Sequence, residues 1–273
     1  MALQRKTLQL IEAAYEVLRE HNPMTLRQVF YQLVARHIID NSRSEYQRLS
    51  NALVRARQEG LIPFEWIEDR VRRPRVVSMW SDLADFLETV RHAYRKDIWA
   101  SQPEYLEVWL EKDALSGIFE EITREYGVTL VVGRGYNSWS AYKEAAGRIA
   151  EQGKPATILY FGDFDPSGED IVRALQEGLS FFGISPKIEK VALTKEDVIR
   201  YQLPPDFTKK TDSRAKKFIE RYGDMAVELD ALPLPILHQK IRAAIEGHLD
   251  MEALAQVLRQ EEYERRVLAE MLA

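Results

Sequence analysis

Apolar residues recur at helical spacing through the first 60 residues and predict three amphipathic helices. The first helix is expected over residues 3–20, and the break HNPM separates it from the second. The second begins with a capping box at Thr25 and the third with one at Ser42, since each residue has a Gln or Glu three positions later. Gly60 is a stop signal for the third helix. Short extended pieces are expected after it, in LIPFEWIEDR.

From Pro103 onward, short apolar runs alternate with helical patterns. This alternation predicts a mainly parallel sheet that is covered by helices on both faces. In such sheets ligands bind beyond the carboxyl ends of the strands. The expected strands are YLEVWLE, VTLVVG, ATILYFGD and KIEKVAL, and the expected helices are DALSGIFEEITREYG, SWSAYKEAAGRIAEQG and PSGEDIVRALQEGLSFFG.

The remaining segments complete a two-domain prediction. Residues 81–99 are expected to form a linking helix, residues 204–222 a mobile loop rich in Pro and Lys, and residues 236–272 helices. Three helices and then a β-element is the order of a winged helix-turn-helix. We therefore expect an α/β protein, with a winged-helix domain over residues 1–100 and a Rossmann-like domain over residues 101–273.

Composition narrows the class of protein. The chain has 273 residues, of which 45% are hydrophobic, so it can bury a substantial core. It has no cysteine, which excludes disulfides and thiolate metal sites and fits a reducing compartment. No apolar run approaches the roughly 18 residues that a membrane-spanning helix needs. We expect a soluble, cytoplasmic protein.

Charge is unevenly distributed along the chain. The net charge is −5, yet residues 24–75 hold 10 Arg, no Lys and 6 acidic residues. This basic segment in an acidic chain favours contact with the phosphates of double-stranded DNA, although a solvated charged face is the simpler alternative. The candidate DNA-binding residues are Arg43, Arg48, Arg55, Arg57, Arg72 and Arg73.

Three acidic residues follow two of the expected strands. Glu111 ends the strand YLEVWL, and Asp163 and Asp165 follow ATILYF after Gly162. Carboxylates this close repel each other unless a cation lies between them, and Mg²⁺ prefers oxygen ligands of this kind. The alternatives are an N-cap for Asp165 and an ion pair for Glu111.

This acidic pattern resembles the toprim domain of topoisomerases, DnaG-type primases and some nucleases. The resemblance lies in a strand-end Glu, a later DxD, and the turn residues Gly162, Pro166 and Gly168. It implies that Glu111, Asp163 and Asp165 hold Mg²⁺, for which Mn²⁺ can substitute, against a nucleic-acid phosphate. It does not say whether the protein cuts, rejoins or polymerises nucleic acid.

A tyrosine in the second helix is a candidate nucleophile. Tyr31 lies about 100° around the helix from Phe30, at the edge of the apolar face, and Arg27 precedes it by one turn. A free phenol has a pKa of about 10 and is a poor nucleophile. A neighbouring guanidinium would favour the phenolate and could hold the attacked phosphate.

The motif LRQVFYQL, upstream of the acidic pattern, resembles the nucleophile motif of the topoisomerase VI A subunit and of the related meiotic double-strand-break endonuclease. Arg27 and Tyr31 fall on the motif's Arg and its second, attacking tyrosine, while Phe30 replaces the first tyrosine. The segment VELDALP, residues 227–233, is also similar to this family. The likeness covers about residues 20–250, in a compact stand-alone form.

The resemblance implies a DNA-cleaving transesterase. Tyr31 would attack the backbone and leave a 5′-phosphotyrosyl link, with Arg27 and Glu111 as further catalytic residues. A break in both strands would need a homodimer, with the tyrosine of one protomer facing the metal of the other. A separate ATPase or accessory subunit is a further implied partner. The alternatives are a toprim nuclease that hydrolyses DNA without a covalent link and a DNA-binding module that does not cleave.

Overall fold

Three helices open the chain: α1 (Arg5–His21), α2 (Leu26–Ala35) and α3 (Arg43–Gln58). The computed structural model describes residues 5–67, 77–133, 138–205 and 214–271. Helix α1 packs against both other helices, and apolar side chains from all three join one core. All three helices predicted from periodicity are therefore confirmed, with ends that differ by one or a few residues.

The starts of α2 and α3 follow their predicted caps. Thr25 Oγ1 accepts a hydrogen bond from Gln28 N, and Thr25 N donates to Gln28 Oε1 at 2.6 Å, so this capping box is complete. At α3, Ser42 Oγ accepts from Glu45 N. The Glu45 carboxylate pairs with Arg48 at 2.9 Å, so the second box is half formed. Both caps satisfy helix N–H groups that lack an intrahelical partner.

The β-element expected after the third helix is present only in part. Residues Phe64–Trp66 form a short 3₁₀ helix, η1, instead of an extended piece. Pro63 precedes it and has no N–H to give to a strand ladder. Ile67 forms one isolated parallel bridge with Met24. Residues 68–76 lie outside the described residues, and the described part of this region contains no β-hairpin.

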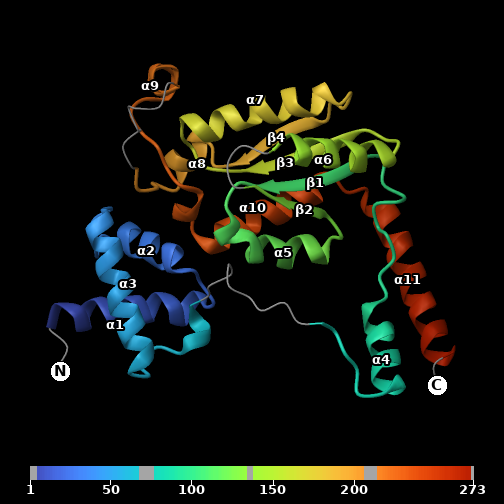
Figure 1. The fold of residues 1–273 in the computed structure, drawn as a ribbon, viewed down its shortest axis with the longest axis horizontal. Coiled ribbons are helices and arrows are strands. Elements are labelled where there is room, and N and C mark those ends of the chain that lie inside the picture. Colours follow the sequence, from blue (N-terminus) through green and yellow to red (C-terminus); the bar gives the residue numbers. More distant parts are fainter. Residues whose placement is uncertain (1–4, 68–76, 134–137, 206–213, 272–273) are drawn as a thin grey trace.

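A single sheet contains β1 (Tyr105–Leu110), β2 (Thr129–Val132), β3 (Ala156–Phe161) and β4 (Lys187–Ala192). Its four strands are parallel and lie in the order β2-β1-β3-β4 (Figure 1). Every residue of β1 is buried, as are all but the first of β3. Such burial is typical of central strands between two helical layers. The expected α/β fold class and its parallel sheet are confirmed.

Helices cover both faces of this sheet; those that follow the first three strands are η3 (Asp113–Leu115), α5 (Ser116–Glu125), α6 (Trp139–Glu151) and α7 (Pro166–Phe181). Alternation along β1 separates two cores. Tyr105 and Trp109 pack with α6 and α7, whereas Leu106 and Leu110 join the core that includes α5. The register places Leu110 beside Phe161, so β1 and β3 end together at one edge.

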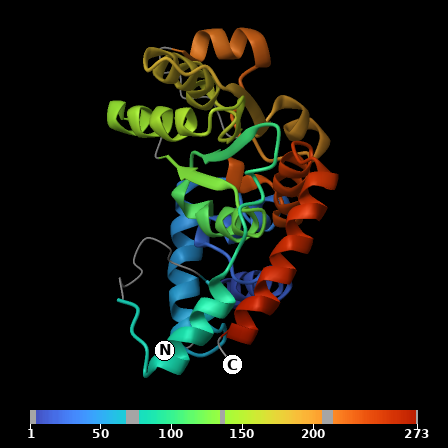
Figure 2. The ribbon, with the colours of Figure 1, turned by 90° about the vertical axis from the view of Figure 1, so that its right-hand side faces the viewer.

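The remaining elements are α4 (Leu83–Ala93), α8 (Lys195–Arg200), α9 (Ala215–Tyr222), η4 (Leu229–Ala231), α10 (Leu234–Glu246) and α11 (Met251–Met271). Helices α10 and α11 confirm the helical prediction for residues 236–272. Helix α4 is shorter than the linking helix predicted over residues 81–99. It lies beside α11 (Figures 1 and 2), where Lys96 Nζ pairs with Glu264 at 2.9 Å.

The loop predicted over residues 204–222 is wrong in its second half, because residues 215–222 form α9. Phe218 is buried against Phe164, with ring centroids 5.1 Å apart, and Tyr222 packs on the same ring at 5.2 Å. This aromatic contact packs the apolar face of α9 against the segment that follows β3. Residues 206–213 lie outside the described residues.

None of the helices in the described residues is both long enough and apolar enough to cross a membrane.

Candidate active site

The carboxyl ends of β1 and β3 bring two of the predicted acids together. Glu111 N donates to Phe161 O at 2.9 Å, and Asp163 N donates to Glu111 Oε2 at 3.1 Å. Gly162 is required between them, since a Cβ there would lie 2.4 Å from Glu111 Oε2 and 2.3 Å from the Tyr160 hydroxyl. The parallel-sheet argument for these two acids is confirmed.

Asp165 lies at the start of α7 and caps it. Its Oδ1 accepts a hydrogen bond from Gly168 N at 2.6 Å, so the N-cap alternative holds for one carboxylate oxygen. The Tyr160 hydroxyl donates to Glu111 Oε2 at 2.9 Å, and the charges of all three acids act on this phenol. After burial, the carboxylates of Glu111, Asp163 and Asp165 raise the pKa of Tyr160 above its ordinary value.

The charge of Asp163 is costly in this site. Burial raises the pKa of Asp163 to about 7; the Lys112 ammonium opposes this rise, and the Glu111 carboxylate adds to it. Lys112 Nζ lies 3.0 Å from Asp163 Oδ1 and also contacts Glu228 (3.0 Å) and Asp230 (2.7 Å). An additional cation near Asp163 would favour its charged form further.

The donor chemistry fits a hard cation, although the present side-chain arrangement does not form a ligand shell. Among the described residues, no three His, Asp or Glu side chains are grouped so as to hold a metal ion. The site nevertheless offers only oxygen donors, which Mg²⁺ prefers. Buried Asp230 Oδ1 also has no hydrogen-bond partner. Glu111, Asp163 and Asp165 remain the candidate ligands, and Asp163 would exchange Lys112 for the ion.

Tyr31 lies on α2, and this helix packs against η4. Its side chain is buried, with 6% exposed, instead of lying at an open edge. Burial, and next the nearby Glu228 carboxylate, raise the pKa of Tyr31. Lys112 and Arg27 oppose this shift. Arg27 therefore favours the phenolate, as expected, but burial and Glu228 outweigh its effect, and Arg27 Nη1 also pairs with Glu228 at 2.9 Å.

A pocket of about 450 Å³ opens beside Tyr31. Arg27 and Tyr31 from α2 line it together with Arg43 from α3, and Ser42, the N-cap of α3, is also in its wall. Two guanidinium groups and a helix N-terminus attract anions. The pocket therefore suits a phosphate next to the tyrosine. Its residues are Arg27, Phe30, Tyr31, Asn41, Ser42, Arg43 and Tyr46.

The other candidate DNA-binding arginines have neighbours of their own. Arg48 pairs with Glu45 at 2.9 Å, and Arg55 with Glu59 at 2.8 Å. Arg57 lies over the Phe64 ring, 5.4 Å from its centroid. Surface ion pairs of this kind contribute little stability and exchange readily for a phosphate. Arg72 and Arg73 lie outside the described residues.

Three site residues received no role from the sequence. Lys112, which directly follows Glu111, contacts Asp163, Glu228 and Asp230. Glu228 and Asp230 lie in VELDALP, where the family likeness was the only signal. Their side chains reach the site from more than 110 residues away along the chain.

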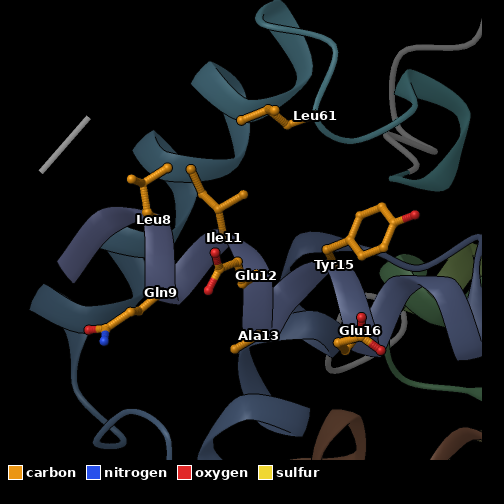
Figure 3. Close-up of a pocket in the computed structure, with 8 residues that line it drawn as sticks. All are labelled: Leu8, Gln9, Ile11, Glu12, Ala13, Tyr15, Glu16 and Leu61. Carbon is orange, nitrogen blue, oxygen red and sulfur yellow. The ribbon is translucent and has the colours of Figure 1, made fainter. Parts of the chain in front are cut away.

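A second pocket, of about 760 Å³, lies on the outer side of α1 and contains none of the predicted site residues (Figure 3). Leu8, Ile11, Tyr15 and Leu61 give it an apolar wall, and Glu12 and Glu16 also line it.

Neither a protein-family model nor a curated protein sequence matches this chain. The fold and the site define an α/β protein with carboxylates beyond the carboxyl end of a parallel sheet and a buried tyrosine linked to them through Glu228 and Lys112.

Proposed function

We propose that this protein is a Mg²⁺-dependent DNA-cleaving enzyme of the topoisomerase VI A-subunit type, which breaks double-stranded DNA through a 5′-phosphotyrosyl intermediate. In this proposal the three N-terminal helices belong to a winged-helix domain and the sheet to a toprim domain. One observation carries the proposal. Tyr31 shares a pocket of about 450 Å³ with Arg27 and Arg43, and three ionic contacts connect Arg27 to Asp163 through Glu228 and Lys112.

Each residue has a task that follows from its position. Arg27 and Arg43 would hold the phosphate, and the Tyr31 oxygen would attack phosphorus as the 3′ oxygen leaves. Glu111, Asp163 and Asp165 would hold the metal. Mg²⁺, when bound, would neutralise charge that develops on the phosphate and the 3′ oxygen.

Duplex cleavage needs two tyrosines and therefore two chains. A homodimer and a separate ATPase or accessory subunit remain predictions, as does the exchange of tyrosines between protomers. In this structure Tyr31 and the acids lie in the same chain, and Arg27 and Glu228 join α2 directly to the residue before η4. Helix α2 supplies Arg27 and Tyr31, and the acids follow the carboxyl ends of β1 and β3.

One observation favours a second candidate, a toprim nuclease that hydrolyses DNA with activated water. Tyr31 is 6% exposed and its pKa is raised, as expected for a structural tyrosine. In that case its hydroxyl would not be needed for cleavage.

The test is cleavage of supercoiled plasmid by wild type and Tyr31→Phe in Mg²⁺, with and without protease digestion before electrophoresis. We expect protein attached to 5′ ends in the wild type, and loss of cleavage in Tyr31→Phe with DNA binding retained. Tyr15→Phe is the matched control. Tyr15 lies on α1, where it packs against Trp66, and it does not line the Tyr31 pocket. Full cleavage by Tyr31→Phe would leave the hydrolytic nuclease standing.

A further inference from the structure

We propose that Glu228 is a catalytic residue, the general base that takes the phenolic proton of Tyr31 as the tyrosine attacks DNA. This inference rests on the proposed function, because it concerns the same tyrosine. The Glu228 carboxylate lies close enough to the Tyr31 phenol to shift its pKa, and Glu228 Oε2 accepts a hydrogen bond from Arg27, one turn before Tyr31 on the same helix, at 2.9 Å. A base must lie within hydrogen-bond reach of the proton that it removes.

The backbone around Glu228 is fixed to the acidic end of the sheet. Val227 and Phe164 exchange two backbone hydrogen bonds of 2.9 Å in an antiparallel bridge. Leu229 N donates to Asp163 Oδ1 at 2.8 Å. Residues on both sides of Glu228 are therefore held by the loop that carries the candidate metal ligands. The backbone contacts that shape the candidate metal site therefore also direct the Glu228 carboxylate toward α2.

The groups around Glu228 keep it charged and oriented. Arg27 from α2 and Lys112 from the end of β1 both contact Glu228 Oε2, at 2.9 and 3.0 Å. Burial acts to raise the pKa of Glu228, but Lys112 and Arg27 outweigh it and the pKa is lowered. Asp230 and Asp163 also pair with Lys112, which weakens the effect of its ammonium on Glu228. Glu228 is therefore an anion at neutral pH, able to accept a proton.

The proposed step needs no reactants besides DNA and water. The bond between Tyr31 Oη and phosphorus forms, and the bond between phosphorus and the 3′ oxygen breaks. The phenolic proton moves to the Glu228 carboxylate, and the 3′ oxygen takes a proton from water; the hydroxide that remains takes the proton from Glu228. Proton transfer from a free phenol to a carboxylate is unfavourable. It becomes favourable as the phenol oxygen bonds to phosphorus, because the phenolic proton then becomes more acidic.

The main variant is Glu228→Gln, which keeps the shape of the side chain and an oxygen for Arg27 but removes basicity. Single-turnover cleavage is followed from pH 6.5 to 9.5, with DNA affinity and thermal unfolding measured in parallel. A general base contributes about 10²–10⁴-fold, and we expect a loss of that order at pH 7. The variant's rate should then rise about tenfold per pH unit, since Tyr31 must ionise unaided, whereas the wild-type rate stays nearly flat.

Two variants separate a base from a structural carboxylate. Glu228→Asp keeps a base at shorter reach, and we expect a reduced rate with a flat pH profile. Asp230→Asn removes one negative charge from the same Lys112, and its profile should also stay flat. If Glu228→Gln does not fold, the profile of Glu228→Asp decides, and a steep rise there would overturn the assignment.

The outcomes for the base and for the tyrosine are distinct. Wild-type rate and a flat profile in Glu228→Gln, together with an inactive Tyr31→Phe, would overturn the role of Glu228 and leave phosphotyrosyl cleavage intact. Equally steep profiles in Glu228→Gln and Asp230→Asn would also overturn it, because they indicate a general charge effect. Full cleavage by Tyr31→Phe would instead remove the proposed function.

Discussion

At the scale of single residues, Asp163 is where burial and charge conflict most. A buried carboxylate with a pKa raised to about 7 binds its proton more tightly in the folded protein than in the unfolded chain, where the ordinary value is 3.8. Its contribution to stability is therefore present below pH 4 and is lost as the pH rises to 7. Lys112 offsets only part of this cost.

We predict that the free energy of unfolding of the metal-free wild type falls, relative to Asp163→Asn, as the pH rises from 4 to 7. The full shift corresponds to at most about 4 kcal/mol. Urea unfolding of both proteins at each pH measures it. If the two stability curves run parallel, Asp163 titrates normally in the folded state.

The same residue should couple metal binding to proton release. Mg²⁺ favours the charged form of Asp163, so we expect binding to tighten between pH 6 and 8 and to release up to about one proton near pH 7. Calorimetry in two buffers of different ionisation enthalpy counts that proton. Asp163→Asn should release none, and a variant that binds Mg²⁺ as tightly as the wild type would contradict the ligand assignment.

At the scale of elements, α3 presents arginines in two environments. Arg43 lines the Tyr31 pocket and has no ion-pair partner among the described residues. Arg48 and Arg55 are half exposed and paired with glutamates of their own helix. A phosphate at Arg43 would displace no carboxylate, while one at Arg48 or Arg55 would have to compete with Glu45 or Glu59.

We predict that Arg43→Ala, Arg55→Ala and Arg57→Ala each weaken DNA binding on all sequences and reduce the salt slope by about one unit. The loss should be largest for Arg43→Ala. Salt-dependent affinity titrations test this, with Arg91→Ala on α4 as the control, because Arg91 is exposed and pairs only with nearby Glu88 among the residues described. Wild-type affinity and slope in all three variants would argue against α3 as the contact surface.

At the scale of the whole molecule, the N-terminal helices and the sheet share one core. Apolar residues of α1, α2 and α3 belong to the same cluster as Leu106, Phe161 and Leu229, and α2 packs on η4. The contact between α2 and η4 thus joins the N-terminal helices to the part of the chain that contains the sheet. The site lies where they meet, so its geometry depends on this shared core.

This continuity predicts one cooperative unfolding transition. Leu229 is fully buried, and Leu229→Ala should lower the free energy of unfolding by about 2–5 kcal/mol without splitting the transition. Circular dichroism and tryptophan fluorescence should give coincident curves. Two separate transitions in the wild type would show that the halves are stable apart.

The sequence alone determined the elements and part of the site. Helical periodicity and short apolar runs, with Gly and capping residues at the ends, are local signals, and they located the three N-terminal helices, the four strands and the C-terminal helices. The contact of Glu111 with Asp163 also followed, because parallel strands end at one edge. Only tertiary structure decided the rest. Helix α9 depends on the contact of Phe218 with Phe164.

Glu228 meets Arg27 across 201 residues and Lys112 across 116. Such contacts leave no periodic trace in the sequence, because a side chain's partners across that distance are set by how α2, η4 and the sheet pack together. The same packing buries Tyr31 and reverses the expected effect of its surroundings on the phenol. Local pattern thus identified the candidate nucleophile and acids, while only the packing of distant segments decided which charges face them.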